Sequence, residues 1–274
     1  MDIEQFWTLI EQARTSAGPA ADQAVRDYDE PSDDPDRDYW DFDDVDLQKV
    51  LGERNLLQEF VESDDDDEAD GAGEEEDEDD EDEDVTDPVA LGLLSLLTQL
   101  PAAEIAAFDN LFEEIRATAE NHDMANAAIL IEHGFLGDDS FDDFRAGLVA
   151  LGRTTFERAV ANPDTLADHP LVREIAAAND PRWLGREDML FVASHAYSLV
   201  TGEDEVTFYD FAEDQRAGED RPAEPADEVD PEDGYWSVED EEQTRRRLPR
   251  LAELFYERST RNRLRAMEKL GLQE

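Results

Sequence analysis

Residues 62–84 form an acidic run, in which eighteen of the twenty-three positions are Asp or Glu and none is Lys or Arg. Like charges at this density repel one another, and the run has no large apolar side chain whose burial could offset that repulsion. We therefore predict that residues 62–86 are disordered. A hydrophobic core has to be built from the segments on either side.

The remainder of the chain is acidic as well. Outside the acidic run, 58 Asp and Glu stand against 23 Lys and Arg, which leaves a net charge of -35. Such a field repels nucleic-acid phosphates and anionic lipid surfaces, and it attracts basic proteins. We expect a basic protein or peptide as partner, no nucleic acid and no membrane.

The chain contains no cysteine, which excludes disulfides, thiolate catalysis and cysteine-bound metals. Its start, "MDIEQFWTLIEQAR", lacks a basic segment followed by a long apolar one. The longest nearly apolar stretch, "PVALGLLSLL", is far shorter than the ~20 residues of a membrane-spanning helix. These features predict a soluble cytoplasmic protein.

Apolar residues recur at spacings of three and four in most of the other segments, which predicts helices. Asp2 and Gln5 have the spacing of a capping box, and Asp87 followed by Pro88 is a typical helix start. Ser140 is expected to cap a further helix. The stretch "EVTFYDF" at 205–211 is the only strand candidate.

These patterns predict an all-α protein: a single irregular helical bundle with a disordered acidic insertion and an acidic C-terminal linker. The expected divisions are a helical domain (1–22 and 87–212), an insertion with one probable helix at 46–60 (23–61), the disordered acidic stretch (62–86), an acidic linker (213–243) and a basic helical segment (244–274).

Several segments, in order, resemble a known family. They are "MDIEQFWTLIEQAR", "LPAAEIAAFDNLFEEI", "DDSFDDFRAGLVALGRTTFERAVANPDTLAD" and "EDMLFVASHAYSLVTG". Together they are similar to the bacterial domain of unknown function 4240 family over residues 1–17 and about 95–202. The resemblance implies a mostly helical bacterial protein with no established activity or catalytic residue. Residues 23–86 then look like an insertion particular to this member.

One polar group is a candidate active site. Asp139, Asp143 and Arg145 lie close together in the sequence, and His195 is a histidine at the border of an apolar helix face. The simpler interpretation is that the acids favour a helix N-terminus and that the histidine lies at the edge of the core. No motif for a metal, phosphate or cofactor occurs, so no cofactor is predicted.

Two acidic-aromatic patches are candidate interaction sites. Tyr39, Trp40 and Phe42 form the first, and Tyr235 and Trp236 form the second. The aromatic rings of such patches either pin a loop to the helical body or present a docking surface rimmed by acid. We favour pinning.

The C-terminal segment has the opposite charge to the rest. From Arg245 to Lys269 nine basic residues stand against three acidic ones, a net charge of +6. The residues singled out are Arg245, Arg246, Arg247 and Arg250. They either form a solvated helix face or make an intramolecular contact with the acidic run.

Together these observations favour a non-catalytic protein-interaction module, similar in its mode of action to acidic immunity or inhibitor proteins. The alternative is an enzyme of unassigned reaction with a site near Asp139, Asp143, Arg145 and His195. We also expect that removal of residues 62–84 leaves the fold intact, with equal or higher stability at low salt unless the run contacts the basic segment.

Overall fold

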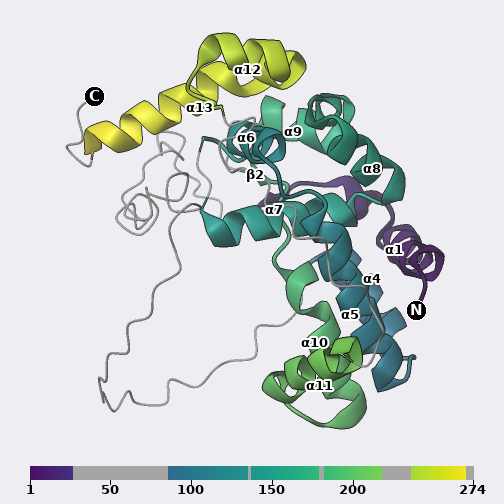
Figure 1. Cartoon of the computed structure of the whole chain (residues 1–274). Helices are drawn as coiled ribbons and strands as arrows, with labels where there is room; N and C mark the ends of the chain where they lie inside the picture. Colours follow the sequence, from purple (N-terminus) through teal and green to yellow (C-terminus); the bar gives the residue numbers. More distant parts are fainter. Residues whose placement is uncertain (27–85, 135–136, 179–181, 218–235, 270–274) are drawn as a thin grey trace, which may run out of the picture.

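The computed structural model of the chain describes residues 1–26, 86–134, 137–178, 182–217 and 236–269. Within these ranges the protein is an all-α, irregular helical bundle, as the sequence predicted (Figure 1). The described elements are α1 (Ile3–Ala17), η1 (Gly18–Asp22), β1 (Val25–Arg26), α4 (Pro88–Leu97), α5 (Ala102–Ala117), α6 (His122–Ile131), α7 (Asp138–Ala150), α8 (Arg153–Ala161), η2 (Pro163–Asp168), α9 (Pro170–Ala177), β2 (Arg182–Trp183), α10 (Asp188–Thr201), α11 (Glu205–Ala217), α12 (Glu241–Arg247) and α13 (Pro249–Lys269).

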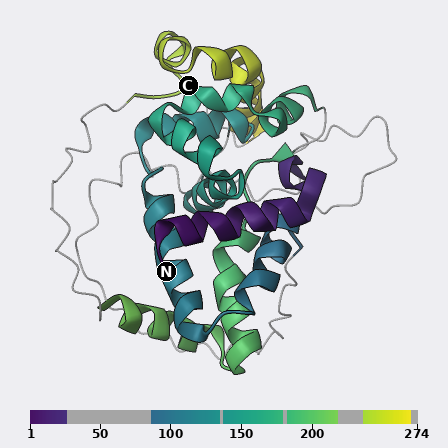
Figure 2. The ribbon, with the colours of Figure 1, turned by 90° about the vertical axis from the view of Figure 1, so that its right-hand side faces the viewer.

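The helices gather into two ends with α7 between them. At one end α10 packs on α4 and α5, and α11 packs on α5 and α10; at the other end α13 packs on α6, α9 and η2. Figures 1 and 2 show these ends at the bottom and top of the molecule. Helix α7 contacts elements of both ends, so the core is continuous. None of the described helices is long and apolar enough to span a membrane.

Helix α1 begins as predicted. The Asp2 side chain accepts a hydrogen bond from the Gln5 backbone N–H, and the Gln5 side chain accepts one from Asp2, each at 2.8 Å. The buried Phe6 ring stacks on Phe108 of α5, with 4.9 Å between ring centroids. Helix α1 crosses α4 at Gly92, where an added Cβ would lie 3.0 Å from the Ala13 carbonyl oxygen. The close approach needs a residue without a side chain.

The strand prediction at 205–211 was wrong, because this segment lies within α11. Phe208 and Ala212, four residues apart, are both buried, and the Phe208 ring packs against Tyr197 of α10. The β-branched and aromatic residues favour a strand only where another strand can pair with them. Here a helix buries the Phe208 ring instead.

The predicted cap of α7 was also wrong in detail. The helix begins at Asp138 with Gly137 as its N-cap, so Ser140 lies inside the first turn. The Ser140 hydroxyl oxygen accepts a hydrogen bond from the Gly137 backbone N–H at 2.7 Å. Ser140 therefore supplies the reciprocal half of a capping box from the third helical position, three positions further along than expected.

Arg186 joins the residues that flank segment 27–85. Its guanidinium forms a buried ion pair with Asp87 at 2.6 Å and donates hydrogen bonds to the carbonyl oxygens of Ala21 and Gln23. Asp188 accepts a further hydrogen bond from the Thr86 backbone N–H at 2.7 Å. Both borders of the segment are thus held at one place. The helix expected at 46–60 and the disorder expected at 62–86 lie outside the described residues.

Candidate functional site

Arg145, one of the predicted site residues, is buried in an ion-pair network between α5 and α7. Its guanidinium pairs with Glu120 at 2.7 Å and with Asp142, and Arg116 reaches Asp142 at 2.8 Å. Burial would raise the pKa of the Asp142 carboxyl, but hydrogen bonds from the two arginines hold this pKa below its usual value. The network joins the two helices and engages both terminal nitrogens of Arg145 in ion pairs.

Asp143 lies against the segment that follows β2. Its Cβ lies 3.2 Å from where a Cβ of Gly185 would stand, and its backbone carbonyl accepts a hydrogen bond from Arg186 at 3.0 Å. Burial, followed by the negative charges of Glu187 and Asp139, raises the pKa of Asp143 to about 7. Asp139 itself is exposed in the first turn of α7, where an acid favours the helix N-terminus.

The sequence reasoning missed Glu132, which lies fully buried at the end of α6. Its Oε1 accepts hydrogen bonds from the backbone N–H groups of Leu184 at 3.0 Å and Gly185 at 3.1 Å. Burial raises the pKa of this carboxyl to about 8. An acid that directly follows the apolar stretch "AAILI" was the available signal, since Glu is rarely buried unless it has hydrogen-bond partners.

His133 and His195 occupy structural positions. His133 has a positive φ of 60°, its Nε2 lies 2.8 Å from the Arg182 carbonyl oxygen, and its ring meets Trp183 edge to face. Burial lowers the pKa of His133 to about 4, so the imidazole is neutral at pH 7. His195 lies half-buried on α10, about 10 Å of helical rise beyond Asp188.

The four residues of the predicted polar site therefore divide among different surroundings. Asp143 faces the segment after β2, Arg145 faces α5, and His195 lies farther along α10. Within the described ranges, no group of three or more acidic or histidine side chains is placed to hold a metal ion. The buried carboxyl of Glu132 accepts backbone hydrogen bonds in this arrangement.

Helix α11 presents an outer face that is both apolar and acidic. Val206 is 73% exposed and Tyr209 is 45% exposed, and they share this face with the exposed acids Asp210 and Glu213. Leu199, near the end of α10, is 69% exposed. The Gly202 turn brings the end of α10 next to the start of α11, so these side chains belong to one corner of the bundle.

Trp236 is buried, which favours the pinning interpretation for this ring. Its indole N–H donates a hydrogen bond to Asp123 at 2.6 Å, and its carbonyl accepts one from the Asn126 side chain at 3.0 Å. The Arg247 guanidinium lies over the ring at 5.5 Å. The other aromatic candidates lie outside the described residues; they are Tyr39, Trp40, Phe42 and Tyr235.

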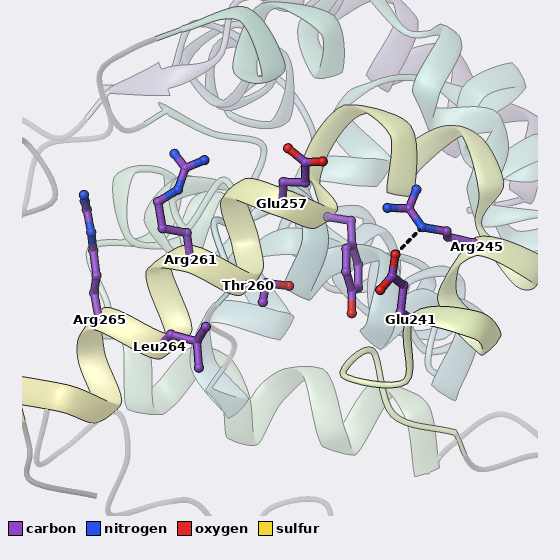
Figure 3. A pocket seen from close by; sticks show the side chains of 8 residues that line it. Glu241, Arg245, Glu257, Thr260, Arg261, Leu264 and Arg265 are labelled. Atoms are coloured by element: carbon purple, nitrogen blue, oxygen red, sulfur yellow. Dashed lines mark hydrogen bonds and ion pairs between the residues drawn. The ribbon is translucent and has the colours of Figure 1, made fainter. Parts of the chain in front are cut away.

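The basic C-terminal segment contributes to a shallow groove of about 470 Å³ on α12 and α13 (Figure 3). Its lining residues are Glu241, Arg245, Tyr256, Glu257, Thr260, Arg261, Leu264 and Arg265.

The four arginines predicted as one basic surface point in different directions. Arg245 lines the groove and pairs with Glu241 at 2.7 Å. Arg246 bonds to the Gln243 side chain, Arg247 pairs with Asp123 and Arg250 pairs with Asp168.

Comparison with known proteins places the central part of the chain in a family. Residues 73–198 match the family model described as a protein of unknown function, DUF4240. No curated protein and no solved structure matches the chain. Helix α1 precedes the matched range but packs against α4 within it, so residues 27–85 separate two elements of one core. The central part of the chain is therefore similar to the DUF4240 family, and residues 27–85 separate the first helix from the rest of the core.

Proposed function

We propose that this protein is a non-catalytic interaction module that binds a basic, amphipathic protein segment on the outer face of α11. The observation that carries the proposal is the combination, on one corner, of exposed apolar side chains with exposed carboxylates. A basic amphipathic helix or strand would bury its apolar side on the exposed apolar side chains and place its cations near the exposed carboxylates.

The charge of the body supports a basic partner. The described residues before 218 include 28 Asp and Glu but only ten Arg and no Lys. Eight of these arginines form ion pairs with acids of the body itself, as Arg145 and Arg186 do. The described part of the chain before residue 218 therefore has many more carboxylates than arginines.

The α11 face is favoured over other acidic surface because it also offers apolar area. No ion pair is found for Asp210 or Glu213 among the described residues, and Val206 and Tyr209 lie about one turn before them on the same helix face. Charge alone attracts cations without selecting among them, whereas exposed apolar side chains give a partner a defined place to bind.

The proposal can be tested with a fluorescein-labelled synthetic peptide of about 18 residues, with Leu at helical spacing and Lys elsewhere. Fluorescence anisotropy would measure its affinity for the intact chain at low salt. The Asp210→Lys, Glu213→Lys variant is expected to bind about tenfold more weakly, since it places two like charges against the peptide. The Leu199→Ser, Val206→Ser variant is expected to weaken binding with no change in net charge.

A charge-matched control separates the α11 face from the overall field. The Glu242→Lys, Glu253→Lys variant changes the net charge equally but on α12 and α13, where both acids are exposed. It should retain nearly the affinity of the unaltered chain. Equal weakening by both Lys variants would contradict a defined binding site on α11. Unchanged affinity in the Leu199→Ser, Val206→Ser variant would show that the apolar side chains do not contribute to binding.

A further inference from the structure

The groove on α12 and α13 is lined by three arginines and two glutamates, a small positive excess on a chain of the opposite sign. Arg261 and Arg265 follow one another along α13, one turn apart, and Arg245 reaches the groove from α12 (Figure 3). The net charge of the whole chain is -53, and residues 62–84 alone contain eighteen carboxylates. An arginine-lined groove in this context is suited to an acidic occupant.

Contacts around the groove leave part of this charge uncompensated by the described fold. No ion pair of Arg261 is found among the described residues, and the Thr260 hydroxyl oxygen, buried in the groove wall, has no hydrogen-bond partner there. Burial and the nearby Arg261 charge together lower the pKa of the Arg258 guanidinium. A negatively charged ligand would relieve this repulsion and accept hydrogen bonds from the groove.

The shape of the groove favours a peptide over a small anion. It is open and follows α13 for more than two turns, from Tyr256 to Arg265, with Leu264 50% exposed in its wall. Separate cations along an extended surface match carboxylates spaced along a chain, and a single compact anion would engage only one end.

We infer that the acidic run of the same chain, residues 62–84, docks on this groove. A separate acidic protein would have to approach a molecule that carries -53 charges, and the long-range field repels it. A segment of the same chain avoids that cost, because its attachment to the folded helices raises its effective concentration at the groove.

The tether is long enough for the contact. Residue 84 lies three positions before Asp87, which the ion pair with Arg186 fixes, so residue 72 is separated from Asp87 by fifteen positions. An extended chain spans about 3.3 Å per residue, which gives a reach of about 50 Å. A compact body of about 190 residues has a radius of gyration of about 16 Å, so the groove lies within that reach.

The absence of cysteine makes the test specific, because only introduced thiols can react. An Ala72→Cys, Leu264→Cys variant would be oxidised mildly at low salt and followed by non-reducing electrophoresis. The control is Ala72→Cys with Leu199→Cys, whose thiol would be exposed near the end of α10, the helix that packs on α4, α5 and α11. The groove pair is expected to form an intramolecular disulfide at least about tenfold faster, and the advantage should vanish at about 0.5 M NaCl, where the Debye length is about 4 Å.

A charge-reversal pair identifies the groove as the cause. Addition of Arg261→Glu and Arg265→Glu should reduce the rate to that of the control pair. Addition of Arg158→Glu and Arg173→Glu, at two exposed arginines near η2, should leave the rate high. Equal rates for the groove and control pairs would overturn docking on this groove, and disulfide-linked dimers as the main product would overturn docking within one chain. The α11 peptide assay is unaffected by any of these results, because it reports on a different surface.

Discussion

At the scale of single residues, Arg186 is the group whose loss should cost the most stability. Its side chain is 1% exposed and that of its partner Asp87 is 7% exposed, so removal of the cation leaves a carboxylate buried and unpaired. The Arg186→Met variant is expected to lose about 3–5 kcal/mol of unfolding free energy, measured by urea titration.

The matched control is Arg153→Met. Arg153 also pairs with two acids, Glu4 and Glu157, but these lie at the surface where water screens the charges. Its effect should be much smaller. Comparable losses for the two variants would show that desolvation does not dominate at Arg186.

Glu132, Asp109 and Asp143 should make the protein less stable as the pH rises. Burial raises the pKa of Glu132 to about 8, and burial with nearby acids raises the other two to about 7. Each carboxyl therefore keeps its proton in the folded state at a pH where the unfolded state has lost it. The contribution of these carboxyls to stability is complete below their pKa values in the unfolded state, near 4. It is lost as the pH rises through their pKa values in the folded state.

The measurement is the unfolding midpoint in urea between about pH 5 and pH 8, where the midpoint should fall steadily. The Glu132→Gln variant keeps an oxygen that can accept the hydrogen bonds from Leu184 and Gly185, but it cannot ionise. Its midpoint should fall less steeply over the same range. An identical slope in the variant would show that Glu132 does not titrate there.

At the scale of secondary-structure elements, the α1–α4 crossing depends on Gly92. A Cβ at this position would lie 3.0–3.4 Å from backbone atoms of Ala13, and backbone atoms cannot rotate away as a side chain can. The Gly92→Val variant is expected to lose about 1–3 kcal/mol by overpacking. Leu91→Ala, at an exposed position on the same helix, should change stability by less than about 0.5 kcal/mol.

Thermal unfolding followed by circular dichroism, together with tryptophan fluorescence, would check this prediction. Trp7 lies on the buried face of α1, so displacement of the helix should also shift its emission to longer wavelength. A stable Gly92→Val protein with unchanged emission would show that the crossing can widen at little cost.

Local signals were sufficient for most helices, since caps and apolar spacing act over a few residues. The Asp2 capping box and the Asp87 start both appear where the sequence predicted them. The element at 205–211 was misassigned because its choice between strand and helix depends on α5 and α10, which lie far from it in sequence.

The candidate sites were harder to predict than the helices. Glu132 owes its environment to Leu184 and Gly185, some fifty residues away, and no spacing rule connects them. The groove likewise requires α12 and α13 to pack against each other. This packing directs the basic residues of a segment with a net charge of +6 toward different parts of the surface. The sequence could indicate the sign of that surface but not which arginines share it.

At the scale of the whole molecule, we expect the acidic run to be dispensable for folding but to affect stability. The core of the described residues is complete without it, so replacement of residues 62–84 by a short Gly/Ser linker should leave the helical circular dichroism of the body unchanged. Because the proposed docking stabilises α13, the unfolding midpoint should fall at low salt, and the difference should vanish at about 0.5 M NaCl.

Differential scanning fluorimetry at two salt concentrations would measure this change. A linker of neutral residues with the full original length is the control, since it keeps the loop-closure entropy the same and removes only the charge. A higher midpoint at low salt in the replaced chain would show that release of self-repulsion outweighs docking, as the sequence alone suggested.

The convergence of both borders of segment 27–85 at Arg186 gives this fold a natural graft point. A guest domain whose own termini lie close together could be spliced there without stretching the host, because the host already holds the two splice sites side by side. Different inserted segments or domains after the first helix are therefore compatible with the same core.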